Sequence, residues 1–286
     1  MDLQELPEGC IANVISLTSP PDACRFSLLS KDIRSAAESD AVWSKFIPPE
    51  THTILSQSSS LSSSPPKSTK ELYMALCDNP VLIDEGNMSF SLDKWSGKKC
   101  YMIAAKRLRI AWGGTPQYWT WKPLPESRFK EAAELRFVCW LEIRGRIDTR
   151  MLSPSTTYKA YLVYKLTQGT YGLDWPSVVT VGARAHGFDY ECPGLMEITA
   201  GIKPTAILVP QRNIEIHIER QVGIYPELNG VKFPNESRAD GWLEMELGEF
   251  HCQGDEEGEL EMICCETSRG KSGLLVQGIE VRPKRN

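Results

Sequence analysis

The residues whose types and spacing are best suited to binding chemistry surround one tight turn. Trp112, Trp119 and Trp121 lie close together around the run Gly-Gly-Thr-Pro at 113–116. An indole ring stacks on flat apolar surfaces, so a turn rimmed with such rings is typical of a recognition surface. A core role is the alternative. Trp119 and Trp121 alternate about Thr120 and share one face of a strand, and an inward-pointing face would bury them.

Catalytic or metal chemistry is not indicated by any other motif. The sequence has no Gly-x-x-x-x-Gly-Lys-Ser/Thr phosphate loop and no Gly-x-Ser-x-Gly elbow. Its nine cysteines are scattered without a Cys-x-x-Cys pair, and its four histidines are equally dispersed. We therefore expect no metal site, no cofactor, and thiols that are reduced and mostly buried.

Length and composition indicate a globular protein with room for one large domain or two ordinary ones. The chain has 286 residues, of which 41% are hydrophobic, and a net charge of −5 that argues against nucleic-acid binding. No apolar run approaches the roughly 20 residues of a membrane-spanning helix. The first ten residues lack the basic and apolar regions of a secretory signal. We expect no membrane association and a location in the cytoplasm, the nucleus or both.

Strand patterns dominate the chain from Lys99 onward. Apolar and polar residues alternate through 137–147, 158–166, 213–219, 242–247 and 274–281. These segments are separated by Gly and Pro, which favours an antiparallel β-sandwich or barrel. Within that domain, 97–121 is predicted to form a strand, a tight turn and a second strand. Trp140 and Trp242 fall inside strand patterns and are expected in the core.

The first part of the chain has helical periodicity. Leu6 to Ile47 contains apolar residues at helical spacing, interrupted by a Pro-Pro-Asp break at 20–22. Ser30 offers a helix cap, and Ser68-x-x-Glu71 forms a capping box for a later helix. Short helices over about 40 residues cannot close a good core alone, so apolar surface should remain for a partner. The Ser-rich tract 56–68 is predicted to be a mobile linker.

The N-terminal segment resembles an F-box. The resemblance rests on Leu6-Pro7, the apolar positions of the first helix, the Pro-Pro-Asp break, Leu28-Leu29-Ser30-Lys31 and Val42-Trp43. It departs from the usual pattern at Gly9-Cys10. The resemblance implies docking onto a Skp-type adaptor and, through it, a cullin ubiquitin ligase, whereas the alternative is an ordinary helical bundle. The implied contact residues are Leu6, Pro7, Ile11, Val14, Ile15, Leu28, Leu29, Val42 and Trp43.

A second resemblance covers most of 98–283. WSGKKCYMIAAKRLRIAWGGTPQYWTW, ELRFVCWLEIRG, YKAYLVYKL, RADGWLEMELGEF and KSGLLVQGIEVRPK stand in the order and spacing of the phloem protein 2 family, which includes the tobacco lectin Nictaba. The resemblance implies a jelly-roll-like sandwich that binds N-acetylglucosamine oligomers or N-glycan cores through two Trp and two Glu. These match Trp112, Trp119, Glu259 and Glu266. Paired carboxylates also occur in glycosidases, but the family resembled is not catalytic.

Together the patterns predict a multidomain α+β chain. The expected parts are an F-box at 1–48, a linker at 49–68, a bracing helix and lead-in at 69–96, and a β-sandwich at 97–286. The predicted function is that of a non-catalytic substrate receptor in an SCF-type ubiquitin ligase. Its target would be an unidentified protein or glycoprotein, which the sandwich could bind through a glycan. One alternative is a stand-alone lectin whose helical part is structural, and another is a sandwich that recognises a bare protein surface.

Overall fold

A computed structural model describes residues 6–56, 58, 66–173, 176–184, 220–223, 227–228, 231–232, 235–254 and 258–285 of the chain. The chain divides into two compact units, 1–102 and 103–286. Strand β3 (Lys99–Ala104) carries the chain across the boundary between them. The predicted strand at 213–219 lies outside the described residues, as do 57 and 59–65 of the predicted Ser-rich linker.

The first unit is helical and ends in a short strand pair. Its helices are α1 (Glu8–Ser16), α2 (Pro20–Phe26), α3 (Lys31–Glu38), α4 (Asp40–Phe46), α5 (Thr51–Ser56) and α6 (Thr69–Asp78). The strands β1 (Val81–Ile83) and β2 (Met88–Leu92) pair antiparallel. Helix α5 occupies part of the range predicted to be linker.

Local capping chemistry sets the starts of several of these helices. The hydroxyl of Ser30 accepts the amide of Ile33 at 3.2 Å and that of Ser68 accepts the amide of Glu71 at 3.2 Å, as predicted. The carboxylate of Glu71 reaches back to the amide of Lys67 at 2.7 Å. These bonds satisfy amides that have no partner within the helix.

An aromatic cluster holds helix α6 against helix α4. The Trp43 ring lies 5.6 Å from that of Phe46 and 5.2 Å from that of Tyr73, measured between centroids. The Trp43 indole donates to the carbonyl of Ala37 at 2.8 Å, and the Tyr73 hydroxyl donates to the carbonyl of Asp93 at 3.2 Å. Burial raises the pKa of Tyr73 well above its usual value. The four N-terminal helices and α6 therefore share a core.

The second unit is an antiparallel β-sandwich, which confirms the predicted fold class of small helical domain followed by sandwich. One sheet has the order β16-β8-β14-β13, with β6 on β16 and β5 on β6, and the other has the order β10-β9-β15-β7-β4. A small pair, β11 with β12, stands apart from both sheets. The strand bounds are β4 Arg109–Ile110, β5 Trp119–Lys122, β6 Ala132–Leu135, β7 Leu141–Asp148, β8 Thr156–Tyr171, β9 Pro176–Arg184, β10 Arg220–Gly223, β11 Glu227–Leu228, β12 Val231–Lys232, β13 Asn235–Ser237, β14 Leu243–Cys252, β15 Glu259–Glu266 and β16 Ser272–Pro283.

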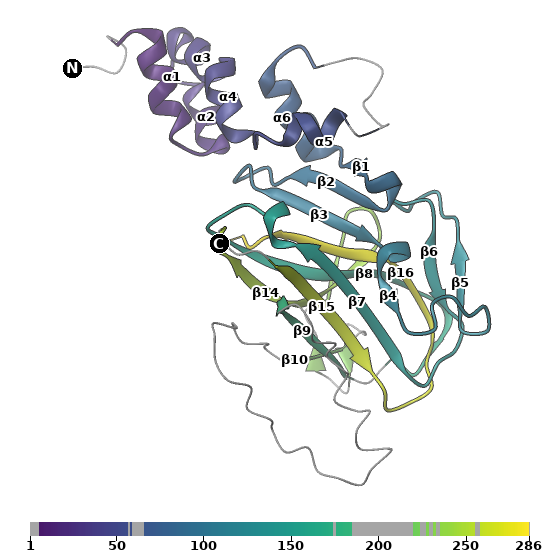
Figure 1. The fold of residues 1–286 in the computed structure, drawn as a ribbon. Helices are drawn as coiled ribbons and strands as arrows, with labels where there is room; N and C mark the ends of the chain where they lie inside the picture. The colour runs from purple at the N-terminus through teal and green to yellow at the C-terminus, as the bar shows by residue number, and fades with distance from the viewer. Residues whose placement is uncertain are drawn as a thin grey trace. The chain divides into compact units, whose positions relative to one another are not determined.

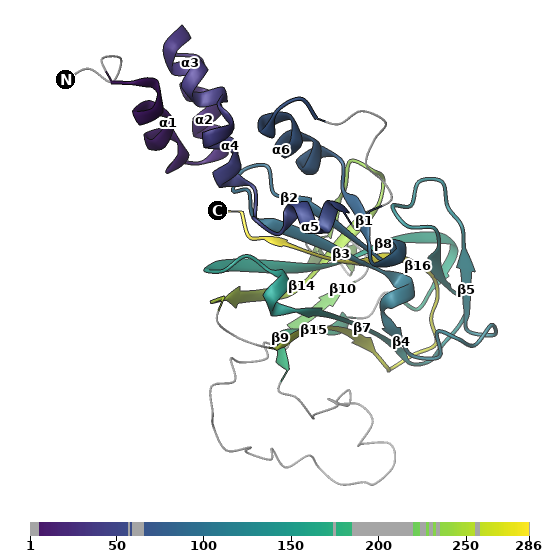
Figure 2. The same cartoon turned by 45° about the horizontal axis from the view of Figure 1, so that its top comes forward.

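The two sheets pack face to face with very little room at the centre. Figure 2 shows them as two layers, with β14, β8 and β16 in one and β9, β15, β7 and β4 in the other. A Cβ placed on Gly145 of β7 would lie 2.9 Å from Ile279 of β16 and 3.2 Å from Leu108. The side-chain tips of Ile279 and Leu108 fill the space over this glycine, so a larger residue there would have to displace them.

The strands predicted on either side of the tight turn in 97–121 do not pair with each other as a hairpin. Strand β4 pairs with β7, and β5 pairs with β6, so neither pairs with the other. The segment 111–118 instead carries the chain from one sheet to the other at one end of the sandwich (Figure 1). The turn was located correctly from its Gly-Gly-Thr-Pro composition, but its partners are long-range strands that local sequence does not specify.

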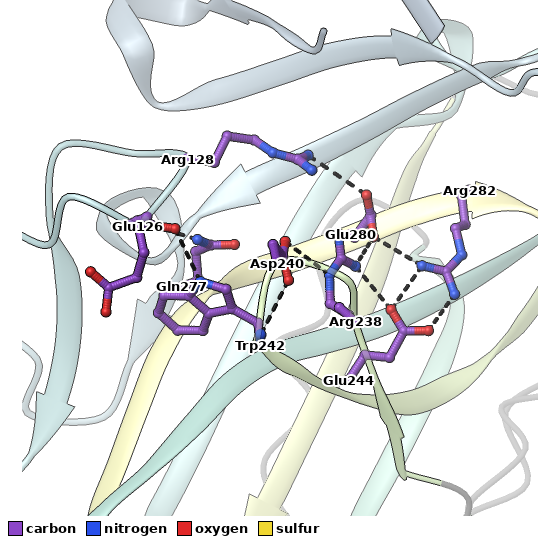
Figure 3. A network of polar contacts seen from close by, with 10 residues as sticks. Glu126, Arg128, Arg238, Asp240, Trp242, Glu244, Gln277, Glu280 and Arg282 are labelled. Atoms are coloured by element: carbon purple, nitrogen blue, oxygen red, sulfur yellow. Dashed lines mark hydrogen bonds and ion pairs between the residues drawn. The ribbon is translucent and has the colours of Figure 1, made fainter. Parts of the chain in front are cut away.

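A buried charge network joins β14 and β16 to two connecting segments (Figure 3). Arg238 donates to Glu244 at 2.9 Å and to Glu280, and Arg282 donates to Glu244 at 2.8 Å and to Glu280 at 3.0 Å. Arg128, from the β5–β6 connection, lies 3.6 Å from Glu280. Burial acts to raise the pKa of Glu280, but the three arginines hold that pKa below its ordinary value.

Cysteine chemistry differs in part from the prediction. Among the described residues, Cys100, Cys252 and Cys264 are buried and outside any disulfide, whereas the thiols of Cys10 and Cys139 are exposed. Cys265 is bonded in a disulfide, contrary to the expectation of reduced thiols. Within the described part of the chain, no group of three His, Cys, Asp or Glu side chains could hold a metal ion. None of the helices described is long and apolar enough to cross a membrane.

Candidate functional site

The crossing segment 111–118 is held by backbone hydrogen bonds. The amide of Ala111 donates to the backbone carbonyl of Glu142 of β7 at 3.0 Å, and the amide of Gly113 donates to the backbone carbonyl of Ile110 at 2.9 Å. The amide of Thr115 donates to the carbonyl of Trp112 at 2.8 Å. These bonds place Trp112 at the apex of a tight turn where the chain leaves β4.

Trp112 has an unusual backbone conformation and a half-exposed ring. Its φ is +55°, in the left-handed region, and 47% of its surface is exposed. This conformation costs a bulky L-residue about 1–2 kcal/mol, and such outliers often occur at functional sites. The Trp112 ring lies 5.4 Å from that of Tyr118 and 6.2 Å from that of Trp140, measured between centroids. We call Trp112, Tyr118 and Trp140 the aromatic platform.

Trp119 occupies a different environment from Trp112. Only 2% of Trp119 is exposed, and its indole donates to the carbonyl of Ala111 at 3.1 Å. Trp121 is half-buried and donates in the same way to the carbonyl of Gly113 at 3.2 Å. The ammonium of Lys106 lies 4.2 Å from the Trp121 ring. The structure thus brings Trp112 and Trp119 together, but Trp119 lies in the core beneath the turn.

Glu266 is engaged by groups of its own turn. Its Oε2 lies 2.5 Å from the ammonium of Lys271, and its Oε1 accepts the amide of Ser268 at 2.7 Å. Lys271 has no exposed surface, and it also donates to the carbonyls of Cys139 at 2.7 Å and of Glu266 at 3.1 Å. Oε1 is therefore hydrogen-bonded inside the protein, and Oε2 is in an ion pair with Lys271 although it accepts no hydrogen bond.

Glu259 lies at the opposite end of the same strand from Glu266. It pairs with Asp148 of β7, whereas Glu266 pairs with Leu141 at the other end of that strand. Seven residues at about 3.3 Å each separate the two carboxylates by roughly 23 Å along the strand, and an odd separation puts them on opposite faces. The structure does not bring Glu259 together with Trp112, Trp119 or Glu266.

A different carboxylate lies beside the aromatic platform. Glu142 accepts the indole of Trp140 at 3.1 Å and the guanidinium of Arg144 at 2.5 Å. Trp140 also packs against the buried pair of Ile263 and Cys265. This arrangement offers rings on which the apolar face of a pyranose can stack, and both oxygens of the neighbouring Glu142 carboxylate are already engaged by Trp140 and Arg144.

The predicted adaptor contacts separate into a buried group and an exposed group. Ile11, Ile15, Val42 and Trp43 are buried and hold the helices together, so their side chains are not at the surface. Leu6 is partly buried, and Pro7, Val14, Leu28 and Leu29 are exposed. The carbonyl of Pro7 accepts the amide of Cys10 at 2.8 Å and so caps α1. Leu17, which the sequence analysis did not select, is also exposed.

Comparison with known proteins finds two family regions in the chain. A model of the phloem protein 2 family matches residues 98–283, and an F-box domain model matches 3–45. The F-box protein At2g02240 of Arabidopsis thaliana is 42% identical over 284 residues, covering 98% of this chain and 80% of the relative. The putative F-box protein PP2-B12 of the same plant is 40% identical over 287 residues and 99% of each chain.

The chain belongs to the phloem protein 2 type of F-box proteins.

Solved structures show only a weak likeness to this phloem protein 2 chain. The carbohydrate-binding module TmCBM61 in complex with β-1,4-galactotriose has a TM-score of 0.29 at 8% identity, covering 63% of this chain and 91% of that one. The xylan-binding CBM22-1 domain from Paenibacillus barcinonensis Xyn10C has a TM-score of 0.31 at 13% identity, covering 64% and 89%. Likenesses at these scores carry no functional argument.

Two platform residues of this F-box phloem protein 2 chain were missed in the sequence. Tyr118 directly precedes Trp119, and side chains alternate between the two faces of a strand, which turns Tyr118 away from the buried face. Its position in this alternation could have identified Tyr118 as exposed. Trp140 was expected in the core, as Trp242 is, but it is only partly buried. It shares the parity of Glu142 and Arg144, which lie on the outer face of β7.

Proposed function

We propose that this protein is the substrate-receptor subunit of an SCF-type cullin ubiquitin ligase. In this proposal the F-box docks onto a Skp-type adaptor, and the β-sandwich binds the target protein. Membership in the F-box phloem protein 2 family supports it, because an F-box match at 3–45 and a phloem protein 2 match at 98–283 lie on one chain. Cytoplasm and nucleus, where such ligases act, are the proposed locations.

One observation carries the docking half of the proposal. Val14, Leu17, Leu28 and Leu29 are large apolar side chains left exposed on a small helical domain, Leu28 at 75%. Leu28 and Leu29 lie next to each other on the connection between α2 and α3. Exposed apolar anchors of this kind are typical of partner-binding surfaces.

The target half of the proposal rests on the aromatic platform. The rings of Trp112 and Tyr118 are exposed, at 47% and 38%, and the indole of Trp140 is fixed by its hydrogen bond to Glu142. We therefore propose that the target is recognised through a glycan that contains N-acetylglucosamine. The chain performs no chemistry itself: it holds a target close to a ubiquitin-conjugating enzyme and so raises its effective concentration.

An adaptor-capture experiment tests the docking half. The double variant Leu28→Ser with Leu29→Ser should lose retention of a purified Skp-type adaptor, because two apolar anchors are removed without opening the core. A matched control is Tyr171→Ser, which removes an exposed ring from β8 in the second unit. The control should retain the adaptor as the wild type does. Equal retention by the double variant would exclude this surface as the docking site.

A stand-alone lectin is the second candidate function. It is favoured by one observation, namely that the aromatic platform is built entirely from residues of the second unit. A lectin of this kind would bind glycans but would not retain the adaptor at all. Adaptor capture with the wild-type chain therefore separates the two functions.

A further inference from the structure

Two indole N–H groups donate hydrogen bonds to the backbone on either side of Trp112. The Trp119 indole donates to the carbonyl of Ala111 at 3.1 Å, and the Trp121 indole donates to the carbonyl of Gly113 at 3.2 Å. Each donor follows its acceptor by eight residues, so the two bonds span the crossing turn from β5. The residue between the two acceptors is Trp112 itself. We call this pair of bonds the indole clamp.

The clamp explains how a strained turn is kept in place. Trp112 has a φ of +55°, a conformation that a bulky side chain leaves unless its surroundings fix it. Trp119 is buried and cannot move without opening the core, so its indole is a rigid anchor for the Ala111 carbonyl. Trp121 is held under the ammonium of Lys106, at 4.2 Å. The strain is confined to the residue whose ring is presented to solvent.

The geometry of the platform indicates which residues meet a ligand. The rings of Trp112 and Tyr118 are inclined at 44°, and those of Trp112 and Trp140 at 82°, so together they form an angled surface. A pyranose with equatorial substituents has an apolar C–H face that stacks on one such ring. Trp119 cannot stack on a sugar at 2% exposure, and the carboxylate of Glu266 is buried, with Oε1 hydrogen-bonded and Oε2 in an ion pair within the protein.

We propose that Trp119 and Trp121 are positioning residues, which hold Trp112 in place, and that the sugar meets the aromatic platform of Trp112, Tyr118 and Trp140. The assignment of sugar contact rests on the proposed glycan recognition. The positioning role does not, because it depends only on the contacts between the indoles and the turn. The probe is a β-linked oligomer of N-acetylglucosamine, the ligand class of the proposed function, whose pyranose units have equatorial substituents.

The test compares matched Trp→Phe variants of the full chain. Trp119→Phe and Trp121→Phe keep an aromatic ring but remove the donating N–H. Trp242→Phe is the control: its indole is also buried and donates to a backbone carbonyl, that of Glu126 at 3.2 Å (Figure 3). Chitotriose binding is measured by titration calorimetry, and hydrogen exchange is measured at the amides of Gly113 and Thr115.

Both clamp variants should bind chitotriose about tenfold more weakly, comparable to the loss of one aromatic contact in Tyr118→Ala. Exchange at Gly113 and Thr115 should be faster in the clamp variants, because the turn opens more often. Trp242→Phe should change neither measurement, although its melting temperature falls. If Trp119→Phe fails to fold, the test rests on Trp121→Phe, since Trp121 is only half-buried.

Each contrary result identifies which part fails. Unchanged affinity in both clamp variants, or an equal loss in Trp242→Phe, would overturn the positioning role. Wild-type affinity in Tyr118→Ala would overturn the platform. If the wild type binds no chitotriose, glycan recognition itself fails. The clamp is then judged by exchange alone, and unchanged exchange at Gly113 in Trp119→Phe would overturn it.

Discussion

At the scale of single residues, Lys271 is the most constrained group near the platform. Its ammonium is enclosed by the carboxylate of Glu266 and by backbone carbonyls, including that of Cys139 at 2.7 Å. Charges removed from water need this kind of full pairing to be tolerated. Because Cys139 directly precedes Trp140, the ion pair also fixes the backbone that leads into the platform.

Removing one member of this pair should be costly. Lys271→Met leaves the Glu266 carboxylate buried without its counter-charge and should lower the free energy of unfolding by about 3 kcal/mol. Urea denaturation measures this change. Lys122→Met is the control, because Lys122 is half-exposed and pairs with Glu134 at 2.6 Å, and exposed pairs contribute only about 0–1 kcal/mol. Similar effects of the two changes would contradict the structural role of Lys271.

The two tryptophans of the crossing turn should differ sharply when truncated. Trp119→Ala opens a cavity in the core and should cost about 3–5 kcal/mol, which lowers Tm strongly. Trp112→Ala removes a half-exposed ring and should change stability by about 1 kcal/mol or less, because little buried surface is lost. Thermal melts followed by circular dichroism measure both. A large drop in Tm for Trp112→Ala would show that its ring is part of the core.

At the scale of elements, the charge network on β14 and β16 makes stability depend on pH. The pKa of Glu280 is lowered from 4.5, because the arginines outweigh the effect of burial. A carboxylate with a depressed pKa stabilises the fold above its unfolded pKa, and this contribution is lost as pH falls through the folded pKa. The wild type should therefore lose stability as the pH falls below about 4.5.

Glu280→Gln tests this contribution. At neutral pH it should lower the free energy of unfolding by about 3 kcal/mol, because Arg238 and Arg128 lose a buried partner. The difference from the wild type should shrink as the pH falls from 4.5 through the lowered pKa of the folded state, because the carboxylate is protonated first in the unfolded chain and then in the folded one. Urea denaturation across this range measures the difference. Glu249→Gln, from a half-exposed pair with Lys284, is the control and should change stability little. A pH-independent difference would contradict the assignment.

The elements also show how far the sequence could predict this molecule. Alternation located the strands β7, β8, β14 and β16 of the sandwich, and Ser30 and Ser68 marked helix starts, because these signals are local. The opposite faces of Glu259 and Glu266 were predictable as well, from their odd separation on one strand. The exposure of Trp112 was not, because it depends on β4 pairing with β7 and β5 with β6 across the sandwich. Such long-range partners leave no trace in the local pattern.

At the scale of the whole molecule, the two proposed binding surfaces occur on one chain. The exposed apolar residues of the helical domain, represented by Leu28 and Leu29, belong to the first unit, and the aromatic platform belongs to the second. Neither surface carries a group with catalytic chemistry in the proposed function. In that proposal the chain supplies the covalent connection between the two surfaces, which would make the encounter of target and ligase effectively intramolecular.

This connection predicts a failure of complementation. A chain with Leu28→Ser and Leu29→Ser should still bind a chitotriose-bearing glycoprotein but not the adaptor, and a chain with Trp112→Ala should do the reverse. In a reconstituted ligase reaction each should leave the glycoprotein unmodified, and so should an equimolar mixture, because no single chain holds both partners. Ubiquitination of the glycoprotein, followed by gel mobility, measures this, with the wild type as the positive control. Restored modification in the mixture would show that two chains associate and share their surfaces, and it would reject the single-chain arrangement.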